Sequence, residues 1–307
     1  MKKPLLYTLR SKLLLTGLLI LGLPMSVATF YSIEAFDKHI KDEVQNELSS
    51  YLTTASLIYE NQKQRLNSIA QTISFDNTCK ITLNLGIIPQ LTMYISGLAK
   101  NYDLNMLLIV DKDGKIICQE HKTDLSLSYL SDHALIQRAL KGESVTSTEI
   151  ESDPRLCASL ESGNSAFMIE AATPIYLRDK LVGVVFAGCL LNNNMKLVEE
   201  IKKTNNETES FIMMGNKVIS STFSNKDSIY LKEQTPYLPG DLEDGSGMKE
   251  RELQGNRYLF ALREIRNIDN NVIGSLGVAF NLERMDAMKK ATTNSRGGRS
   301  CRTCLTG

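Results

Sequence analysis

The stretch AFMIEAATPIYLRDKLVGVVFAG, residues 166–188, decides the fold. Its two apolar runs, 166–176 and 181–188, are rich in β-branched and aromatic residues, and Arg178 and Asp179 lie between them. Two such runs separated by a short polar segment predict antiparallel strands that are joined by a hairpin turn.

Another strand pair precedes this one in the chain. The runs MLLIV (106–110) and IICQ (116–119) flank a short polar segment that contains Asp113 and Gly114. Because glycine accepts the positive φ that hairpin turns demand, an Asp-Gly step between such runs is a strong hairpin signal. Residues 131–141 follow with a helical pattern, and Gly142 suits the C-terminal cap of that helix.

The same order of elements recurs later in shorter form. Residues 210–221 repeat the first strand pair, and residues 257–280 repeat the second. Gly183 and Gly274 take matching positions just after the second turn, 91 residues apart. We therefore predict an α+β fold with an internal duplication, in which each module has an antiparallel sheet. Chance similarity between antiparallel hairpins is the alternative.

The N-terminus has the character of a membrane anchor. Residues 1–12 carry four basic residues and no acidic one, and residues 13–33 carry no charge. A run of about 20 apolar residues can cross a bilayer as a helix, with its basic flank in the cytoplasm. The alternative is a signal peptide that is cleaved after Ser26-Val27-Ala28. Under either interpretation the remaining chain is exported.

A long amphipathic helix is predicted over residues 34–75. Apolar residues recur at steps of three and four from Phe36 to Ile73, and polar residues fill the other face. At about 1.5 Å per residue such a helix reaches roughly 60 Å, more than the width of a small domain. It needs a partner along its length, so we expect stacked domains, a homodimer through this helix, or both. Residues 81–102 also have a helical pattern, with Gly86 and Pro89 as interruptions.

These patterns divide the chain into segments, and no second membrane helix appears among them. The expected order is a cytoplasmic N-terminus (1–12), a transmembrane helix (13–33), a stalk helix (34–75), a membrane-distal module (76–204), a membrane-proximal module (205–280), an exit helix (281–290) and a disordered tail (291–307).

The composition excludes several classes of function. Lysine plus arginine and aspartate plus glutamate both number 35, whereas a nucleic-acid binder has a basic surplus. No zinc-protease, nucleophile-elbow or phosphate-loop motif occurs in the chain. We therefore expect no enzyme activity, no catalytic residue, no cofactor and no nucleic-acid partner.

The six cysteines give no metal-ligand spacing. Cys301 and Cys304 lack both a second ligand pair and a following histidine, so neither a metal site nor covalent haem is predicted. The other four allow three disulfide pairings, with no choice among them. Small buried side chains are the simpler interpretation of Cys118 and Cys189, which lie in strand-like runs.

Four segments together are similar to one known family: LLIVDKDGKIICQEH, SYLSDHALIQRALKGE, AATPIYLRDKLVGVVFAGCLL and RNIDNNVIGSLGVAFNL. With the long helix, the region from Ile33 to Lys290 resembles the double Cache sensor domains of bacterial chemoreceptors and sensor histidine kinases. The resemblance implies a long helix, two stacked PAS-like modules, and a small-molecule site in the membrane-distal module. Many similar sensors have an arginine four residues before the strand-ending proline, where it can bind a ligand carboxylate.

In this chain that position is Glu170, which reverses the charge. A cationic or amine-bearing ligand is one hypothesis, and a distal module that binds nothing is the other. The sequence leaves open whether Glu170 faces a pocket or solvent. His133 lies five residues before Arg138, and this spacing does not place both on one helix face. The candidate ligand contacts are Glu170, His121, Arg138, Arg155, Phe167, Thr173 and Tyr176.

The sequence thus predicts the ligand-sensing region of a bacterial transmembrane receptor, of the chemotaxis or sensor histidine kinase type, without its output region. We expect it in the bacterial inner membrane, with the sensing region periplasmic or extracellular. Ligand binding in the distal module would be relayed through the helices to the membrane. The alternative is a membrane-tethered periplasmic binding or scaffold protein that acts through a separate partner.

Overall fold

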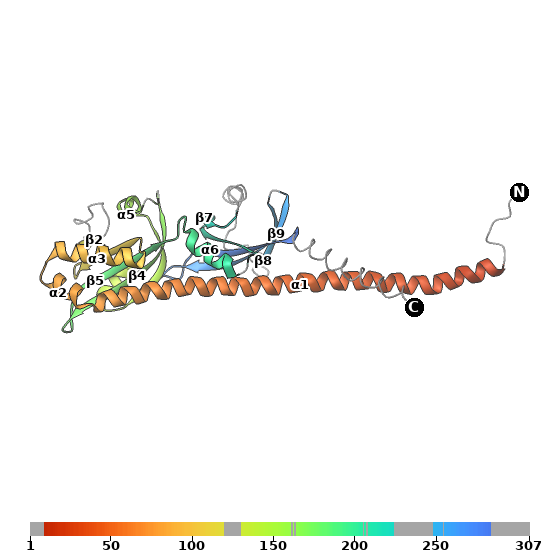
Figure 1. Cartoon of the computed structure of the whole chain (residues 1–307), viewed down its shortest axis with the longest axis horizontal. Coiled ribbons are helices and arrows are strands. Elements are labelled where there is room, and N and C mark those ends of the chain that lie inside the picture. The colour runs from red at the N-terminus through yellow and green to blue at the C-terminus, as the bar shows by residue number, and fades with distance from the viewer. Residues whose placement is uncertain are drawn as a thin grey trace, which may run out of the picture. The chain divides into compact units, whose positions relative to one another are not determined.

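The computed structural model describes residues 9–119, 130–160, 162, 164–204, 206, 208–223, 248–253 and 255–283. The chain divides into two compact units, residues 1–50 and 51–307, and the second unit contains both sheets. Figure 1 shows the elements in chain order. The helices are α1 (Leu9–Phe75), α2 (Asn77–Asn84), α3 (Ile88–Tyr102), α4 (Ala134–Leu140), α5 (Pro154–Ser159) and α6 (Met195–Thr204).

Two five-stranded antiparallel sheets form the core of the second unit, as the sequence predicts. The first has the strand order β2-β1-β5-β4-β3 and the second has the order β7-β6-β10-β9-β8. The strands are β1 (Met106–Asp111), β2 (Ile116–Gln119), β3 (Val145–Glu151), β4 (Ala166–Leu177), β5 (Lys180–Leu190), β6 (Thr208–Met214), β7 (Lys217–Ser221), β8 (Met248–Leu253), β9 (Asn256–Arg266) and β10 (Val272–Asn281).

The order of the strands confirms the predicted duplication, because the second sheet repeats the first with each strand in the same place. Gly183 and Gly274 also take equivalent positions. A side-chain carbon at Gly183 would lie 2.4 Å from the carbonyl oxygen of Val110, and one at Gly274 would lie 2.2 Å from that of Met213. Both glycines therefore let the neighbouring strand approach closely.

Turn chemistry explains the two hairpins of the first sheet. Asp111 accepts hydrogen bonds at Oδ1 from the N–H groups of Asp113 and Lys115, both at 2.9 Å. Between β4 and β5, Arg178 and Asp179 both have positive φ (48° and 64°), which type I′ hairpin turns require. Both predicted hairpins are confirmed.

Two strands and one helix break differ from the sequence prediction. Strands β3 and β8, which pair along one edge of each sheet, were not predicted. The helical pattern over 81–102 is two helices, α2 and α3, because Gly86 has a φ of 67° and Pro89 lies in the first turn of α3. The exit helix is described only as far as Glu283, and the predicted tail lies outside the described residues.

The two faces of the first sheet are covered by different helices. On one face Leu83 of α2 lies against Gly183, and Tyr59 of α1 is hydrogen-bonded to Thr148 of β3. The other face belongs to an apolar cluster that includes Leu135 of α4 and Leu156 of α5. Because alternate strand residues point to opposite faces, each side chain of β3 and β4 can be assigned to one of these two layers.

Helix α1 is continuous from Leu9 to Phe75 and contains Pro24. It includes the whole predicted stalk, residues 34–75. Within the part of the chain that the structure describes, no helix is both long and apolar enough to cross a membrane. The transmembrane helix predicted over 13–33 is therefore not confirmed.

All four cysteines among the described residues are buried and free: Cys79, Cys118, Cys157 and Cys189. Burial raises the pKa of the Cys79 and Cys118 thiols to about 12 and that of Cys189 to about 11. The thiols of Cys79, Cys118 and Cys189 therefore stay protonated at neutral pH. They act as small packing residues, which confirms the simpler interpretation of Cys118 and Cys189.

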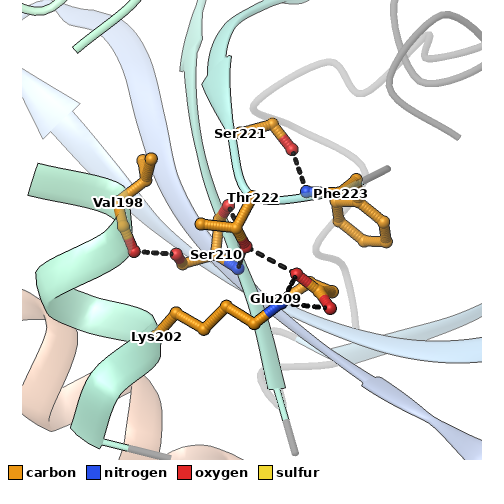
Figure 2. Close-up of polar contacts among 7 residues, drawn as sticks. All are labelled: Val198, Lys202, Glu209, Ser210, Ser221, Thr222 and Phe223. Atoms are coloured by element: carbon orange, nitrogen blue, oxygen red, sulfur yellow. Dashed lines mark hydrogen bonds and ion pairs between the residues drawn. The ribbon is translucent and has the colours of Figure 1, made fainter. Parts of the chain in front are cut away.

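The Glu209 carboxylate of the second sheet has local partners (Figure 2). Glu209 at the start of β6 accepts hydrogen bonds from Lys202 of α6 at 2.7 and 2.6 Å and bonds to Thr222 at 2.6 Å. Ser210 beside it donates its hydroxyl to the Val198 carbonyl of α6 at 2.5 Å. These bonds hold α6 against β6 and leave the Glu209 carboxylate fully partnered.

Candidate functional site

The central strand β4 carries a charged side chain into the core of the first sheet. Glu170 is 0 % exposed and faces Ser147 of β3 and Gly188 of β5. Residues directly opposite in an antiparallel pair share a face, so Glu149 and Glu151 of β3 point to the same side as Glu170. This is the side that helices α4 and α5 cover, and three carboxylates therefore converge beneath these helices.

His133 brings an imidazole into this acidic layer. It is the residue before α4, with extended backbone (φ −72°, ψ 124°), and its side chain makes no capping bond to the helix. The ring packs edge-on against Phe186 of β5, with centroids 5.0 Å apart. In this position Nε2 lies 3.3 Å from Oε2 of Glu170 and 3.7 Å from Oε2 of Glu151. We call His133, Glu151 and Glu170 the His–Glu cluster.

Glu151 is fixed by the backbone that follows it. Its Oε1 accepts hydrogen bonds from the N–H groups of Ser152 and Asp153 at 2.7 and 2.6 Å. The carbonyl of Glu151 accepts a bond from the Sγ of Cys157 in α5 at 3.4 Å. These contacts leave Oε2 directed at His133, so the carboxylate is held in place before any ligand arrives.

Glu170 lacks such support. Among the described residues, neither of its carboxylate oxygens has a hydrogen-bond partner, and Nδ1 of His133 has none either. A buried polar group left without a bond costs about 1–3 kcal/mol, and more if it is charged. The contact with Nε2 of His133 at 3.3 Å offsets this cost only when the imidazole is protonated, because only then is it an ion pair.

The two groups bind protons more tightly than they would in water. Burial raises the pKa of Glu170, and the nearby His133 opposes this only in part. Burial alone would lower the pKa of His133, but the carboxylates of Glu170, Glu151 and Glu149 outweigh it and raise that pKa. The cause in both groups is an excess of negative charge in a desolvated layer.

This donor set suits a cation. The ligand atoms of His133, Glu151 and Glu170 lie within 4.8 Å of one another, a spacing at which a single ion or ammonium group can reach all three. Sequence spacing predicts no metal site because the three residues come from a loop and two strands that are far apart in the chain. Carboxylate and imidazole groups are ligands of divalent metals and partners of amines.

The acidic layer also touches the second sheet. Oε1 of Glu149 accepts a hydrogen bond at 2.8 Å from the N–H of Ile268, in the turn between β9 and β10. Arg138 of α4 lies 3.9 Å from Asp269 in the same turn; the Arg138 side chain is half-buried and that of Asp269 is exposed. A strand and a helix that border the cluster therefore contact one turn of the second module.

Two of the predicted contact residues lie on the opposite face from Glu170. Phe167 is fully buried and close to Gly274 of β10, where it packs the first sheet against the second. Thr173 is buried, and its hydroxyl has no hydrogen-bond partner among the described residues. Because both are an odd number of residues from Glu170 on one strand, they cannot share a binding surface with it.

The remaining predicted residues are spread around the layer. Tyr176 is half-exposed, and its hydroxyl lies near Gly142 at the end of α4. Arg138 makes the surface ion pair with Asp269. Arg155 lies in α5, but its side chain is not described, and His121 lies outside the described residues. Of the five predicted residues whose side chains the structure describes, only Glu170 belongs to the cluster.

Sequence reasoning missed His133 and Glu151 as site residues. The signal for Glu151 is the alternation Thr148-Glu149-Ile150-Glu151, which places two carboxylates on one face of a strand. The signal for His133 is its position immediately before the helix. The three- and four-residue spacing that groups side chains on one helix face does not apply to a residue outside the helix, so His133 can point toward the sheet.

A separate cavity of about 450 Å³ lies beside α6, lined by polar groups that include Arg65, Asp103 and Lys196. Lys196 is ion-paired to Asp103, and both are strongly exposed. A smaller cavity of about 240 Å³ lies between α1 and β9 and is lined by Tyr59 and Arg263 among others. Neither cavity includes a residue of the His–Glu cluster, and neither contains a buried charge without a partner.

Comparison with solved structures supports the fold. The sensor domain of the V. cholerae histidine kinase DctB has a TM-score of 0.53 and 14 % identity, over 78 % of this chain and 98 % of that chain. The periplasmic domain of Vibrio cholerae LuxQ has a TM-score of 0.53 and 13 % identity, over 76 % and 99 %. The sensory domain of the Campylobacter jejuni chemoreceptor Tlp3, with isoleucine bound, has a TM-score of 0.54 and 13 % identity, over 80 % and 96 %.

At these identities the likeness shows the fold alone, and no curated protein matches the chain. A family model extends the comparison to the sequence. The model described as the double sensory domain of two-component sensor kinase (dCache_3) matches residues 41–283, which is most of the chain. The match includes α1 from residue 41, both sheets and the His–Glu cluster. The chain therefore belongs to the family of double sensory domains of two-component sensor kinases.

Proposed function

We propose that this chain is the input domain of a transmembrane receptor and that its first module senses a positively charged ligand at the His–Glu cluster. The observation that carries the proposal is the Glu170 carboxylate, which is fully buried without a hydrogen-bond partner among the described residues. Its negative charge is the reverse of the arginine that the family resemblance leads one to expect. A ligand with a positive charge is the natural complement.

The relay would start from the strand and helix that border the cluster. A ligand can bias a conformational equilibrium only if it binds the two states with different affinity. Ligation of Glu151 and Glu170 would set the position of β3, and Glu149 on that strand is bonded to the turn at Ile268. We propose that this turn transmits the change into the second sheet.

The membrane anchor and the dimer belong to the same proposal. The uncharged run over residues 13–33 and its basic flank support an anchored, extracytoplasmic receptor. Within the second unit, Leu57 of α1 is 60 % exposed, and an exposed leucine on a long amphipathic helix favours pairing with a second copy. We expect such a homodimer to carry the signal along α1.

A thermal-shift screen of the full chain in mild detergent tests the sensing function. The library contains divalent metal salts, organic amines, amino acids, organic acids and purines. A ligand that binds only the folded state adds about 2.7 kcal/mol of stability at a hundred times its dissociation constant. For a domain of this size that raises the melting temperature by roughly 5–10 °C.

The matched variants are Glu170→Gln and Glu209→Gln, which make the same change in the first and second sheets. We expect the shift to disappear in Glu170→Gln and to persist in Glu209→Gln, whose carboxylate already has Lys202 and Thr222 as partners. No cationic response in the whole library, or a response that Glu170→Gln leaves intact, would contradict the proposal.

A further inference from the structure

The His–Glu cluster has the composition and spacing of a metal site. We propose that the first module binds one divalent transition-metal ion through Nε2 of His133, Oε2 of Glu151 and Oε2 of Glu170. This inference rests on the proposed cation-sensing function and gives the chemical class of its ligand.

The distances fit such an ion. Metal bonds to imidazole nitrogen and carboxylate oxygen are about 2.1 Å long, so ligand atoms at tetrahedral angles lie roughly 3.4 Å apart. Nε2 of His133 lies 3.3 Å from Oε2 of Glu170 and 3.7 Å from Oε2 of Glu151. One ligand atom from each of the three residues lies within 4.8 Å of the other two. Small side-chain adjustments are enough to bring all three onto one ion.

The missing hydrogen bonds provide an independent observation. Glu170 is 0 % exposed and directed at His133, yet neither of its oxygens has a hydrogen-bond partner among the described residues. In contrast, Glu151 is anchored through Oε1, so its Oε2 is left for a ligand. A metal ion supplies the partner that Glu170 lacks.

The donor set decides between a metal and an amine. An ammonium group needs only hydrogen-bond acceptors, and the two carboxylates would be sufficient for it. The imidazole of His133 adds a nitrogen ligand of the kind that transition metals prefer. A metal ion uses the neutral imidazole as a ligand together with both carboxylates. One nitrogen with two oxygens suits Zn²⁺, Mn²⁺, Co²⁺ or Ni²⁺ better than Ca²⁺ or Mg²⁺, which prefer oxygen ligands alone.

Three protein ligands leave at least one coordination position open. Structural zinc sites have four protein ligands, whereas sites with three keep a place for water or for a small molecule. The carbonyl of Glu151 is held by Cys157, and the ring of His133 is held by Phe186. Such outer contacts orient metal ligands before binding.

The test is a calorimetric titration of the full chain with ZnCl₂, MnCl₂ and CoCl₂ after removal of metals with EDTA. The background carries Cys301→Ser and Cys304→Ser, so that thiol ligands from this pair cannot contribute to the measured zinc binding. We expect one ion per chain and a rise in melting temperature that EDTA reverses. We also expect bound Co²⁺ to show visible absorption of nitrogen and oxygen ligation without a sulfur charge-transfer band.

Variants assign the site. His133→Gln and Glu170→Gln should each weaken metal binding by at least about tenfold, because loss of a direct ligand exceeds the effect of losing an outer contact. Glu209→Gln in the second sheet should leave it unchanged. Circular dichroism checks that each variant folds. If one variant fails to fold, the Co²⁺ spectrum of the parent chain still identifies the type of ligand atom.

The outcomes separate this inference from the sensing function. Metal binding that both variants leave intact would place the ion elsewhere and overturn the inference. Stabilisation by organic amines but not by metals, lost in Glu170→Gln and kept in His133→Gln, would overturn the metal assignment and leave cation sensing in place. Failure of every cation would overturn both.

Discussion

The two sheets can be compared residue by residue, because Ile175 faces Gly183 in the first and Ile265 faces Gly274 in the second. Five positions earlier on these central strands stand Glu170 and Phe260. The same point of the same fold therefore carries a carboxylate in one module and an aromatic ring in the other.

The surroundings differ in the same way. Phe260 belongs to an aromatic cluster in which its ring lies 5.9 Å from that of Phe211 and 6.3 Å from that of Phe223. Glu170 instead meets His133 and has no hydrogen-bond partner among the described residues. The second sheet shows that this fold does not need a charge at the position. Since a buried charge costs stability, its presence in the first sheet supports the proposed binding site.

The largest effect is expected when the glutamate of the first sheet is introduced at the equivalent position of the second sheet. Phe260→Glu removes a buried ring and leaves a carboxylate without a partner, which should lower the free energy of unfolding by about 4 kcal/mol or more. Urea denaturation followed by circular dichroism measures this loss. The control Phe260→Leu keeps the site apolar and should cost about 1.5 kcal/mol or less. Equal losses in the two variants would show that charge is tolerated here and would remove the contrast between the sheets.

An intermediate effect is expected at the glycines that the two sheets share. Gly183→Ala and Gly274→Ala would each place a carbon 2.4 or 2.2 Å from a neighbouring carbonyl oxygen. We expect each to lower the free energy of unfolding by about 2 kcal/mol, because the strands must move apart. Gly97→Ala in α3, which meets nothing within 4 Å, should raise it by up to about 1 kcal/mol.

Thermal unfolding of the three glycine variants sharpens the comparison of the sheets. Similar losses for Gly183 and Gly274 would support a duplicated structural role. A large loss at one position and none at the other would mean that the two modules use equivalent glycines differently.

Much of the fold could be predicted because its signals are local. The hairpins follow from apolar runs around turns such as the one at Gly114, and the duplication follows from their repetition. Strands β3 and β8 were missed because they lie at sheet edges, where residues such as Thr146, Thr148 and Lys249 alternate without a clear apolar face. An edge strand is identified by its partner in the sheet rather than by its own composition.

The site was harder to predict because, like an edge strand, it depends on partners that are distant in the sequence. Glu170 could be singled out from one strand, but its partners depend on the pairing of β3 with β4 and on the path of the chain before α4. Phe167 and Thr173 were grouped with Glu170 by proximity in sequence, although strand alternation directs them to the other face. The contrast between their positions shows that register, more than composition, decides which side chains meet.

The smallest effect on the free energy of unfolding is expected from Glu170→Gln in metal-free protein. The size of this effect depends on pH. Burial raises the pKa of Glu170, and the surrounding carboxylates raise that of His133, so the folded chain holds protons that the unfolded chain releases. The free energy of unfolding should therefore fall as pH rises above the ordinary glutamate pKa, by at most about 1.4 kcal/mol per pH unit for each proton.

Glutamine at this position has no proton to lose and takes negative charge away from His133. The variant should therefore follow a flatter pH curve and be more stable than the parent by about 1 kcal/mol near pH 8. Urea denaturation at several pH values, with EDTA present, measures both curves, and Glu209→Gln provides the control from the second sheet. If Glu170→Gln and the parent fell in parallel, the buried carboxylate would not be the source of the pH dependence. The loss of stability at high pH would then have to come from groups other than the buried carboxylate that distinguishes the first sheet from the second.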